Sequence, residues 1–127
     1  MKDEGWTGEA LGMRTLEKAS AVSDEDKALL QELKAVIQHH RADAEILLYG
    51  SVARGAAGPE SDYDVLVLTE DPLEWQEEEA VRAAVYELEL EHDVIASMVV
   101  TSRAQWDRSV VRGSPFRKEV ERDAIVL

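Results

Sequence analysis

Four consecutive apolar residues, from Val65 to Leu68, constrain the fold of this chain more than any other feature. Side chains of a β-strand point alternately to the two faces of a sheet, so a strand that is apolar at every position is covered on both faces. Such a strand lies in the middle of a sheet. Because Asp62 and Asp64 precede the apolar residues, we predict a central strand over residues 62–68 with a polar beginning.

Helical and extended patterns alternate around this central strand. Ser23 is a typical helix cap, and apolar residues at helical spacing after it predict a helix that runs to about His40. Short apolar runs predict further strands over residues 44–49 and from about residue 93 to 100. Asp71 and Pro72 are expected to open a long helix, and Thr101 and Ser102 to cap a further one. We also expect a helix from Ser114 to Glu121 and a last strand over residues 125–127.

The alternation of helices and strands predicts an α/β fold, with a small mixed β-sheet and helices packed mainly on one face. A chain of 127 residues is long enough to bury one core and too short for two ordinary domains. Residues 1–22 show no sustained period, so we expect an N-terminal arm there that is partly flexible. We expect the single domain over residues 23–127.

The charge balance limits the partners of this chain. Asp and Glu number 27 against 14 Lys and Arg, which gives a formal net charge of −13. Binding to a nucleic acid backbone depends on Lys and Arg that displace counterions, so nucleic acid is not expected as a direct partner. A basic protein would be attracted instead. Any bound nucleotide must be neutralised locally, by metal, by backbone amides or by a few placed arginines.

The sequence also indicates the compartment. It contains no cysteine, so it forms neither disulfides nor a thiolate metal site. The first residues do not resemble an export signal, and no apolar run approaches the length that a membrane-spanning helix needs. We therefore expect a cytoplasmic protein with no membrane partner.

Two aspartates at the beginning of the central strand are candidate metal ligands. Side chains at positions i and i+2 of a strand point to the same face, which places the carboxylates of Asp62 and Asp64 side by side. Oxygen ligands of this kind select hard cations such as Mg²⁺, which also bind phosphate oxygens. Taken alone, the pair is also typical of a solvated turn.

The end of the preceding strand favours the metal interpretation. Gly50 allows a sharp turn and a close approach of the backbone, and Ser51 offers a hydroxyl and an amide for terminal phosphates. An ordinary strand-to-helix turn explains each residue but not their combination with the aspartate pair. A Walker loop is excluded, because Ala56 and Ala57 stand where that motif requires Lys and Ser or Thr.

The residues around Gly50 and Ser51, and those from Asp62 to Asp64, resemble the signature of the minimal nucleotidyltransferase (MNT) group of the DNA polymerase beta superfamily. That signature is an apolar residue, Gly-Ser, a spacer and Asp-x-Asp. The resemblance covers about residues 27–127. It implies a nucleotidyltransferase fold that transfers a nucleoside monophosphate, here AMP from ATP, to an acceptor hydroxyl and releases pyrophosphate.

The resemblance also implies a ligand set for two Mg²⁺ ions. Asp62 and Asp64 would share these ions with a third carboxylate from a later strand, and Asp93 is the position that matches. Glu89 and Glu91 lie just upstream of Asp93 and are alternatives. Before the resemblance is considered, a turn between a helix and a strand explains Asp93 nearly as well.

The same resemblance assigns the nucleotide-binding residues. Gly50 and Ser51 would hold the terminal phosphates of the NTP, and Arg54 would offset part of the negative charge of the triphosphate. For Arg54 the alternative is an ion pair with one of the many acidic side chains of the surface.

Three functions fit these residues. Many small members of the group resemble antitoxins that silence a HEPN-domain ribonuclease toxin by adding AMP to a tyrosine, and the acidic surface suits a basic partner of that kind. The second is a binding module with a vestigial site, which would engage a partner through the acidic helix around residues 75–91. The third is transfer to a small molecule such as an aminoglycoside. A homo-oligomer and a hetero-oligomer are both compatible with the sequence.

Overall fold

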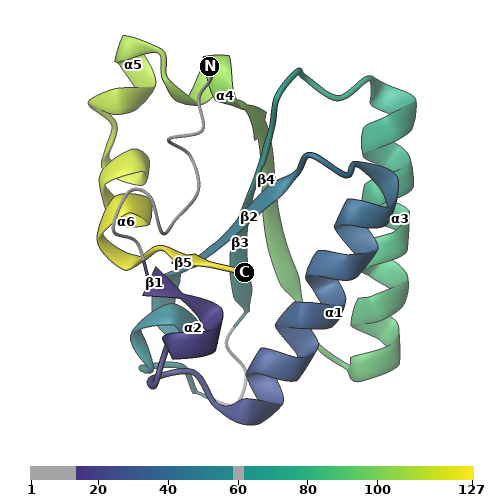
Figure 1. Ribbon diagram of the computed structural model, residues 1–127, viewed down its shortest axis with the longest axis vertical. Coiled ribbons are helices and arrows are strands. Elements are labelled where there is room, and N and C mark those ends of the chain that lie inside the picture. Colours follow the sequence, from purple (N-terminus) through teal and green to yellow (C-terminus); the bar gives the residue numbers. More distant parts are fainter. Residues whose placement is uncertain (1–13, 59–61) are drawn as a thin grey trace.

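A five-stranded mixed sheet forms the centre of the molecule (Figure 1). The computed structural model describes residues 14–58 and 62–127. The strands are β1 (Arg14–Thr15), β2 (Glu45–Tyr49), β3 (Tyr63–Thr69), β4 (Ala96–Ser102) and β5 (Ile125–Val126), in the order β1-β5-β2-β3-β4. β2 runs antiparallel to β5 and β3, whereas β1 is parallel to β5 and β4 is parallel to β3. The predicted small mixed sheet is confirmed.

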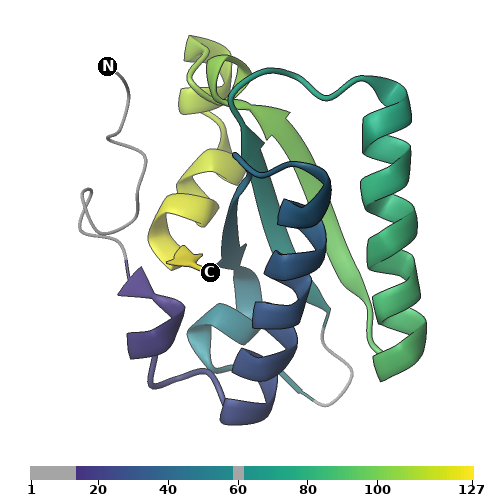
Figure 2. The ribbon, with the colours of Figure 1, turned by 45° about the vertical axis from the view of Figure 1, so that its right-hand side comes forward.

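Helices cover both faces of this sheet, and the two longest lie on the same face. The helices are the 3₁₀ turn η2 (Leu16–Lys18), α1 (Asp24–His40), α2 (Gly50–Arg54), α3 (Trp75–His92), α4 (Arg103–Trp106), α5 (Ser109–Arg112) and α6 (Pro115–Asp123). Figure 2 shows α1 in front of the strands and α3 to its right, and the two helices contact each other. Over the described ranges 14–58 and 62–127, no helix has the length and apolarity needed to cross a membrane.

The central position predicted for residues 62–68 is confirmed by β3. All four residues from Val65 to Leu68 are buried. Val65 and Val67 face the core beneath α1 and α3, whereas Leu66 and Leu68 face a second apolar cluster that includes Trp106 of α4 and Val120 of α6. The polar beginning of β3 therefore has its aspartates on the face that carries α4 and α6.

The predicted helix after Ser23 is confirmed by α1. The Ser23 hydroxyl accepts a hydrogen bond from the amide of Asp26 at 3.1 Å, which satisfies one of the free amides of the first turn. Leu30, Leu33 and Ile37 then fall on the buried face of the helix. The helix ends at His40, as the apolar spacing predicts.

The long helix α3 begins later than predicted, at Trp75 instead of Pro72. The carbonyl of Asp71, which would accept the first helical hydrogen bond, instead accepts from the Thr69 hydroxyl at 2.6 Å and from the Arg41 guanidinium at 3.2 Å. Glu74 takes the cap position with an extended backbone. Arg41, the residue that follows α1, thus occupies the carbonyl that an earlier helix start would use, and the sequence near Asp71 gives no sign of that contact.

The strand expected from about residue 93 begins at Ala96. Asp93 caps the end of α3 in the left-handed region, at φ 57°. Short polar side chains tolerate this conformation better than most others do. The chain therefore turns at Asp93 before it enters the sheet.

Part of the predicted N-terminal arm belongs to the core. Arg14 and Thr15 pair with β5, and Leu16, Ala19 and Val22 are buried. Residues 1–13 of the predicted arm lie outside the described residues. This segment contains only a two-residue strand and a short 3₁₀ turn, so its buried apolar residues follow no regular spacing. For that reason the sequence predicts that the domain begins only at residue 23.

Candidate metal and nucleotide site

Asp62 and Asp64 lie at the beginning of β3, on the face of the sheet that carries α4 and α6. Both side chains are half-buried, and Asp64 pairs with Tyr49 of β2 and with Ser97 of β4. Burial raises the pKa of Asp64, the negative charges of Asp62 and Glu119 raise it further, and Arg54 opposes only part of that effect. The two aspartates thus carry a repulsion that a bound cation would relieve.

Gly50 brings the backbone against the Asp64 carboxylate. It follows β2 directly and begins α2 with φ +80°, a conformation that favours glycine. A Cβ atom at this position would lie 2.4 Å from Asp64 Oδ2, which is closer than two unbonded atoms can approach. The structure thus gives a physical reason for glycine beside the aspartate pair: any larger residue would push Asp64 away from its present position.

Ser51 and Arg54 lie on the same short helix. Ser51 is half-buried in the first turn of α2, directly after Gly50. Arg54, in the last turn, pairs with Asp123 of α6 through Nη1 and Oδ2 at 2.7 Å. Arg54 therefore makes an ion pair, the alternative considered from the sequence, although its partner is buried, not on the surface. Its effect on the pKa of Asp64 shows that its charge still reaches the aspartate pair.

Asp123 was not identified from the sequence, yet it fastens α2 to α6. Its side chain is 2% exposed, and Oδ2 accepts from the amide of Gly50 at 3.3 Å as well as from Arg54. Arg122 donates to Oδ1 at 2.9 Å. Arg122 and then Arg54 hold the pKa of Asp123 below its ordinary value, so the carboxylate stays charged. One buried carboxylate among 27 acidic residues leaves no pattern in a sequence.

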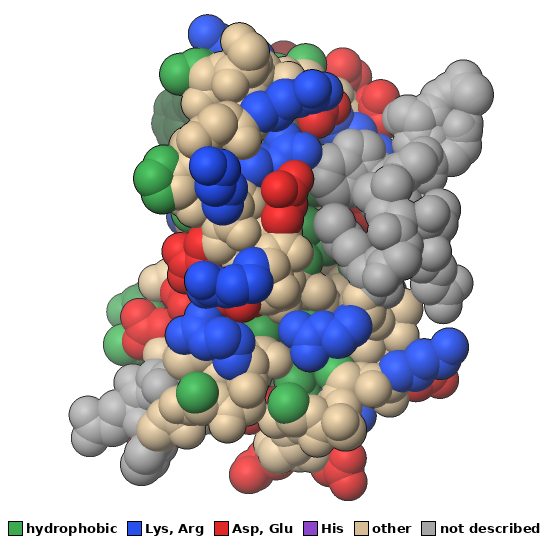
Figure 3. Space-filling view, turned by 90° about the vertical axis from the view of Figure 1, so that its left-hand side faces the viewer, with side chains coloured by type: hydrophobic (Ala, Val, Ile, Leu, Met, Phe, Trp, Pro, Cys, Tyr) green, Lys and Arg blue, Asp and Glu red, His purple; other side chains and the backbone are tan. Residues whose placement is uncertain are grey.

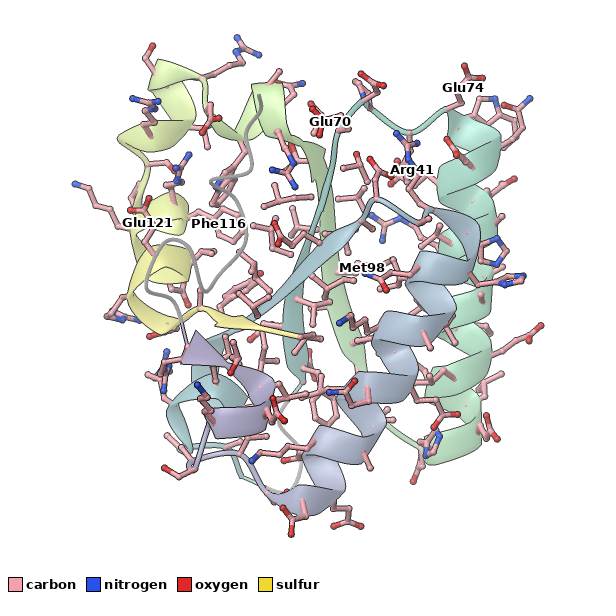
Figure 4. All side chains as sticks on the ribbon, viewed as in Figure 1. Arg41, Glu70, Glu74, Met98, Phe116 and Glu121 are labelled. Atoms are coloured by element: carbon pink, nitrogen blue, oxygen red, sulfur yellow. The ribbon has the colours of Figure 1, made fainter. Side chains whose placement is uncertain are left out.

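An aromatic cluster positions α6 over the site. Phe116, labelled in Figure 4, meets the ring of Tyr49 edge-on at 5.5 Å and the ring of Trp106 at 5.9 Å. Burial raises the pKa of Tyr49, and the charges of Asp64 and Glu119 add to the effect. Glu119 of α6 is therefore a second acidic neighbour of the site that sequence reasoning missed.

Asp93 lies in the cap of α3, three residues before β4. The carboxylate oxygens of the three predicted ligands do not all lie within 4.8 Å of one another; these ligands are Asp62, Asp64 and Asp93. Within the part of the chain that the structure describes, only the exposed group Glu32, Glu91 and His92 does so. The role of Asp93 as third carboxylate stays a prediction.

Glu89, one of the alternatives to Asp93, has another partner. Its Oε2 accepts a hydrogen bond from the amide of Ala96 at 2.7 Å. That amide belongs to the first residue of β4. Glu89 therefore supports the beginning of the strand instead of facing the aspartate pair.

A basic face lies beside the site in spite of the acidic composition. Figure 3 shows Lys and Arg side chains gathered on the side of the molecule that carries α2, α5 and α6. Arg54 and Arg122, which both contact Asp123, belong to α2 and α6. Positive charge is therefore present where α2, which contains Gly50 and Ser51, meets α6.

The donor set fits a divalent cation. The carboxylates of Asp62 and Asp64 offer several oxygen atoms at the edge of the core, and oxygen ligands suit Mg²⁺. Their mutual repulsion is the electrostatic condition that such an ion relieves. The residues present therefore fit Mg²⁺ at the beginning of β3.

Comparison with known proteins places the chain in a family. The model of the nucleotidyltransferase domain matches residues 29–123, which is more than half of the chain and includes Gly50, Ser51, Asp62 and Asp64. The chain therefore belongs to the nucleotidyltransferase domain family.

Comparisons with curated proteins and with solved structures do not narrow the family further. A search of curated proteins finds no match. A solved chain, from work on the structural basis for the activity of a cytoplasmic RNA terminal U-transferase, is 32% identical over 49% of this chain, with a TM-score of 0.39. The match spans only 21% of the length of that protein.

Replacing Gly50 by alanine should damage the site and the fold together. The positive φ costs roughly 1–2 kcal/mol for a residue with a Cβ atom, and the new atom forces the Asp64 carboxylate to rotate away. We expect a lower free energy of unfolding in urea and loss of Mg²⁺-dependent ATP binding in calorimetry.

Gly113→Ala is the matched control for this substitution. Gly113 has φ −87°, and the nearest atom to a new Cβ would be the Ser109 carbonyl oxygen at 3.9 Å. Its stability should stay within about 0.5 kcal/mol of the unmodified protein. Equal behaviour of the two variants would contradict the role assigned to Gly50.

Asp123→Asn should loosen α2 from α6. The variant removes the negative charge that accepts three hydrogen bonds from Arg54 and Arg122, so we expect the free energy of unfolding to fall by about 1–3 kcal/mol at pH 7. Because the pKa of Asp123 is lowered in the folded state, its contribution is complete above the ordinary aspartate pKa and is lost as the pH falls through the lowered value. The difference from the unmodified protein should therefore shrink in acid.

Glu121→Gln, on the same helix, is the control for Asp123→Asn. Glu121 pairs with Arg117 at 3.0 Å, and its side chain is 53% exposed. Exposed pairs of this kind contribute little, so its removal should change stability by less than about 0.5 kcal/mol. A loss as large as that of Asp123→Asn, or a loss that does not depend on pH, would count against the anchoring role of Asp123.

Proposed function

We propose that this chain transfers AMP from ATP to an acceptor hydroxyl and releases pyrophosphate, with Mg²⁺ held by Asp62 and Asp64. The observation that carries the proposal is the close approach of the Gly50 backbone to the Asp64 carboxylate, which only glycine permits. Membership of the nucleotidyltransferase domain family supports the same chemistry.

In the proposed reaction the acceptor oxygen forms a bond to the α-phosphorus and its proton passes to water. The bond between that phosphorus and the bridging oxygen breaks, and its electron pair leaves with pyrophosphate. When bound, Mg²⁺ supplies charge neutralisation and lowers the pKa of the attacking hydroxyl. Ser51 binds the terminal phosphates through its hydroxyl and amide, while Gly50 shapes the turn that precedes it. Arg54 adds positive charge from the other end of α2. The protein then acts mainly by positioning and by electrostatics, which a small domain can supply.

The acceptor that we favour is a tyrosine of a HEPN-type toxin, as in the antitoxins that the sequence resembles. Ile95, which directly precedes β4, and Val99 of β4 leave an apolar strip on the sheet face that carries the aspartates, with 60% and 39% of their surfaces exposed. An aromatic side chain suits such a strip. The net charge of −13 also suits a basic partner.

One observation favours the alternative of a binding module that neutralises a partner without transfer. Asp93, the expected third carboxylate, lies in a helix cap and forms no close group with Asp62 and Asp64. The two functions differ in a simple respect: a binding module still inhibits its partner when the aspartates are replaced. Transfer to a small molecule such as an aminoglycoside keeps the chemistry and changes only the acceptor.

The test is transfer of label from each of the four NTPs to a candidate HEPN toxin in the presence of Mg²⁺. We expect label from ATP on the toxin, and its loss in the Asp62→Ala/Asp64→Ala variant. Asp71→Asn, at the other end of β3, is the control and should label the toxin normally. Unlabelled toxin that is still inhibited by the double variant would favour the binding module.

A further inference from the structure

The register of the two parallel strands identifies the β4 side chain nearest to the aspartates. Asp64 lies opposite Ser97, and the amide of Tyr63 donates to the carbonyl of Ile95 at 2.9 Å. Paired residues of neighbouring strands point to the same face of a sheet. Ser97 therefore faces the same side as Asp62 and Asp64. Its hydroxyl donates to Asp62 Oδ2 at 3.4 Å, so the two side chains are in contact.

Glu89 and Asp93 belong to α3 and its cap, so both lie outside β4. Asp93 occupies the left-handed cap of α3, and Glu89 accepts from the outward-facing amide of Ala96. Arg82 donates to the carbonyl of Met98 on the same outer edge of β4 at 3.4 Å. Two side chains of α3 thus bind backbone groups on the free edge of β4, whereas the face beside the aspartates carries the Ser97 hydroxyl.

We propose that Ser97 stands where a third metal-binding carboxylate would stand, and that this site consequently holds one divalent cation tightly instead of two. The inference rests on the proposed metal site at Asp62 and Asp64. Two carboxylates carry the charge that offsets one divalent ion, and a serine hydroxyl adds a neutral oxygen to them. A second divalent ion next to the first would meet repulsion that the neutral Ser97 hydroxyl does not relieve.

Ser97 acts on the metal through Asp62 as a positioning residue. A hydroxyl that donates to Asp62 Oδ2 orients that carboxylate and leaves its other oxygen for the cation. A second ion would then arrive only with the triphosphate, whose oxygens provide the missing negative charge.

Binding of Mn²⁺, followed by electron paramagnetic resonance in the absence of nucleotide, tests the inference. We count only the ions that are lost in Asp62→Asn/Asp64→Asn, which removes any contribution from the exposed group of Glu32, Glu91 and His92. The unmodified protein should hold one such ion. Ser97→Asp should bind a second ion or bind the first at least tenfold more tightly, and Ser97→Asn, which adds similar bulk without charge, should do neither.

Asp93→Asn separates the inference from the prediction made on the sequence. We expect it to leave the number of bound ions unchanged. Two tight ions in the unmodified protein, with one lost in Asp93→Asn, would overturn the inference and leave the proposed function standing. A folded Ser97→Asp, checked by circular dichroism, with unchanged Mn²⁺ binding would also overturn it. If the unmodified protein bound no Mn²⁺ at Asp62 and Asp64, the proposed function itself would fail.

Discussion

The contact between the Gly50 backbone and the Asp64 carboxylate is the constraint on which the rest of the site depends. It requires a positive φ and the absence of a Cβ atom, so one residue type alone permits it. The buried carboxylate of Asp123 then fixes the turn by accepting from the Gly50 amide and from Arg54. The sheet, α2 and α6 are thereby joined at the point where the candidate metal ligands lie.

Electrostatics connects this contact to function. The site gathers acidic groups from β3 and α6, and burial together with mutual repulsion raises the pKa of Asp64. The folded protein thus keeps two carboxylates in an arrangement that is unfavourable without a cation. Arg54 and Arg122 supply positive charge nearby, but both are engaged with Asp123 and cannot replace a metal between the aspartates. This electrostatic arrangement supports the proposal that the site binds a metal-bound triphosphate.

The sequence predicts the elements whose cause is local and misses those whose cause is a distant partner. The apolar run in β3, the Ser23 cap of α1 and the Ser114-Pro115 start of α6 are all read correctly, because periodicity and capping act within a few residues. The late start of α3 depends on a contact from Arg41, and the burial of Leu16 depends on packing against the core. In the site, motif spacing predicts that Gly50 and the two aspartates act together. The ion pair of Arg54 with Asp123 depends on a tertiary contact, and the position of Ser97 opposite Asp64 depends on strand register, so neither could be predicted from the sequence.

The most direct test of the central claim is where a cation binds. Two-dimensional ¹⁵N NMR spectra recorded with substoichiometric Mn²⁺ locate the ion, because the resonances of nearby amides broaden first. We predict early broadening at Ser51, Asp64 and Ser97, around the beginning of β3. Broadening centred on the exposed group Glu32, Glu91 and His92, with the amides around Asp64 unaffected, would contradict the assignment of the metal site.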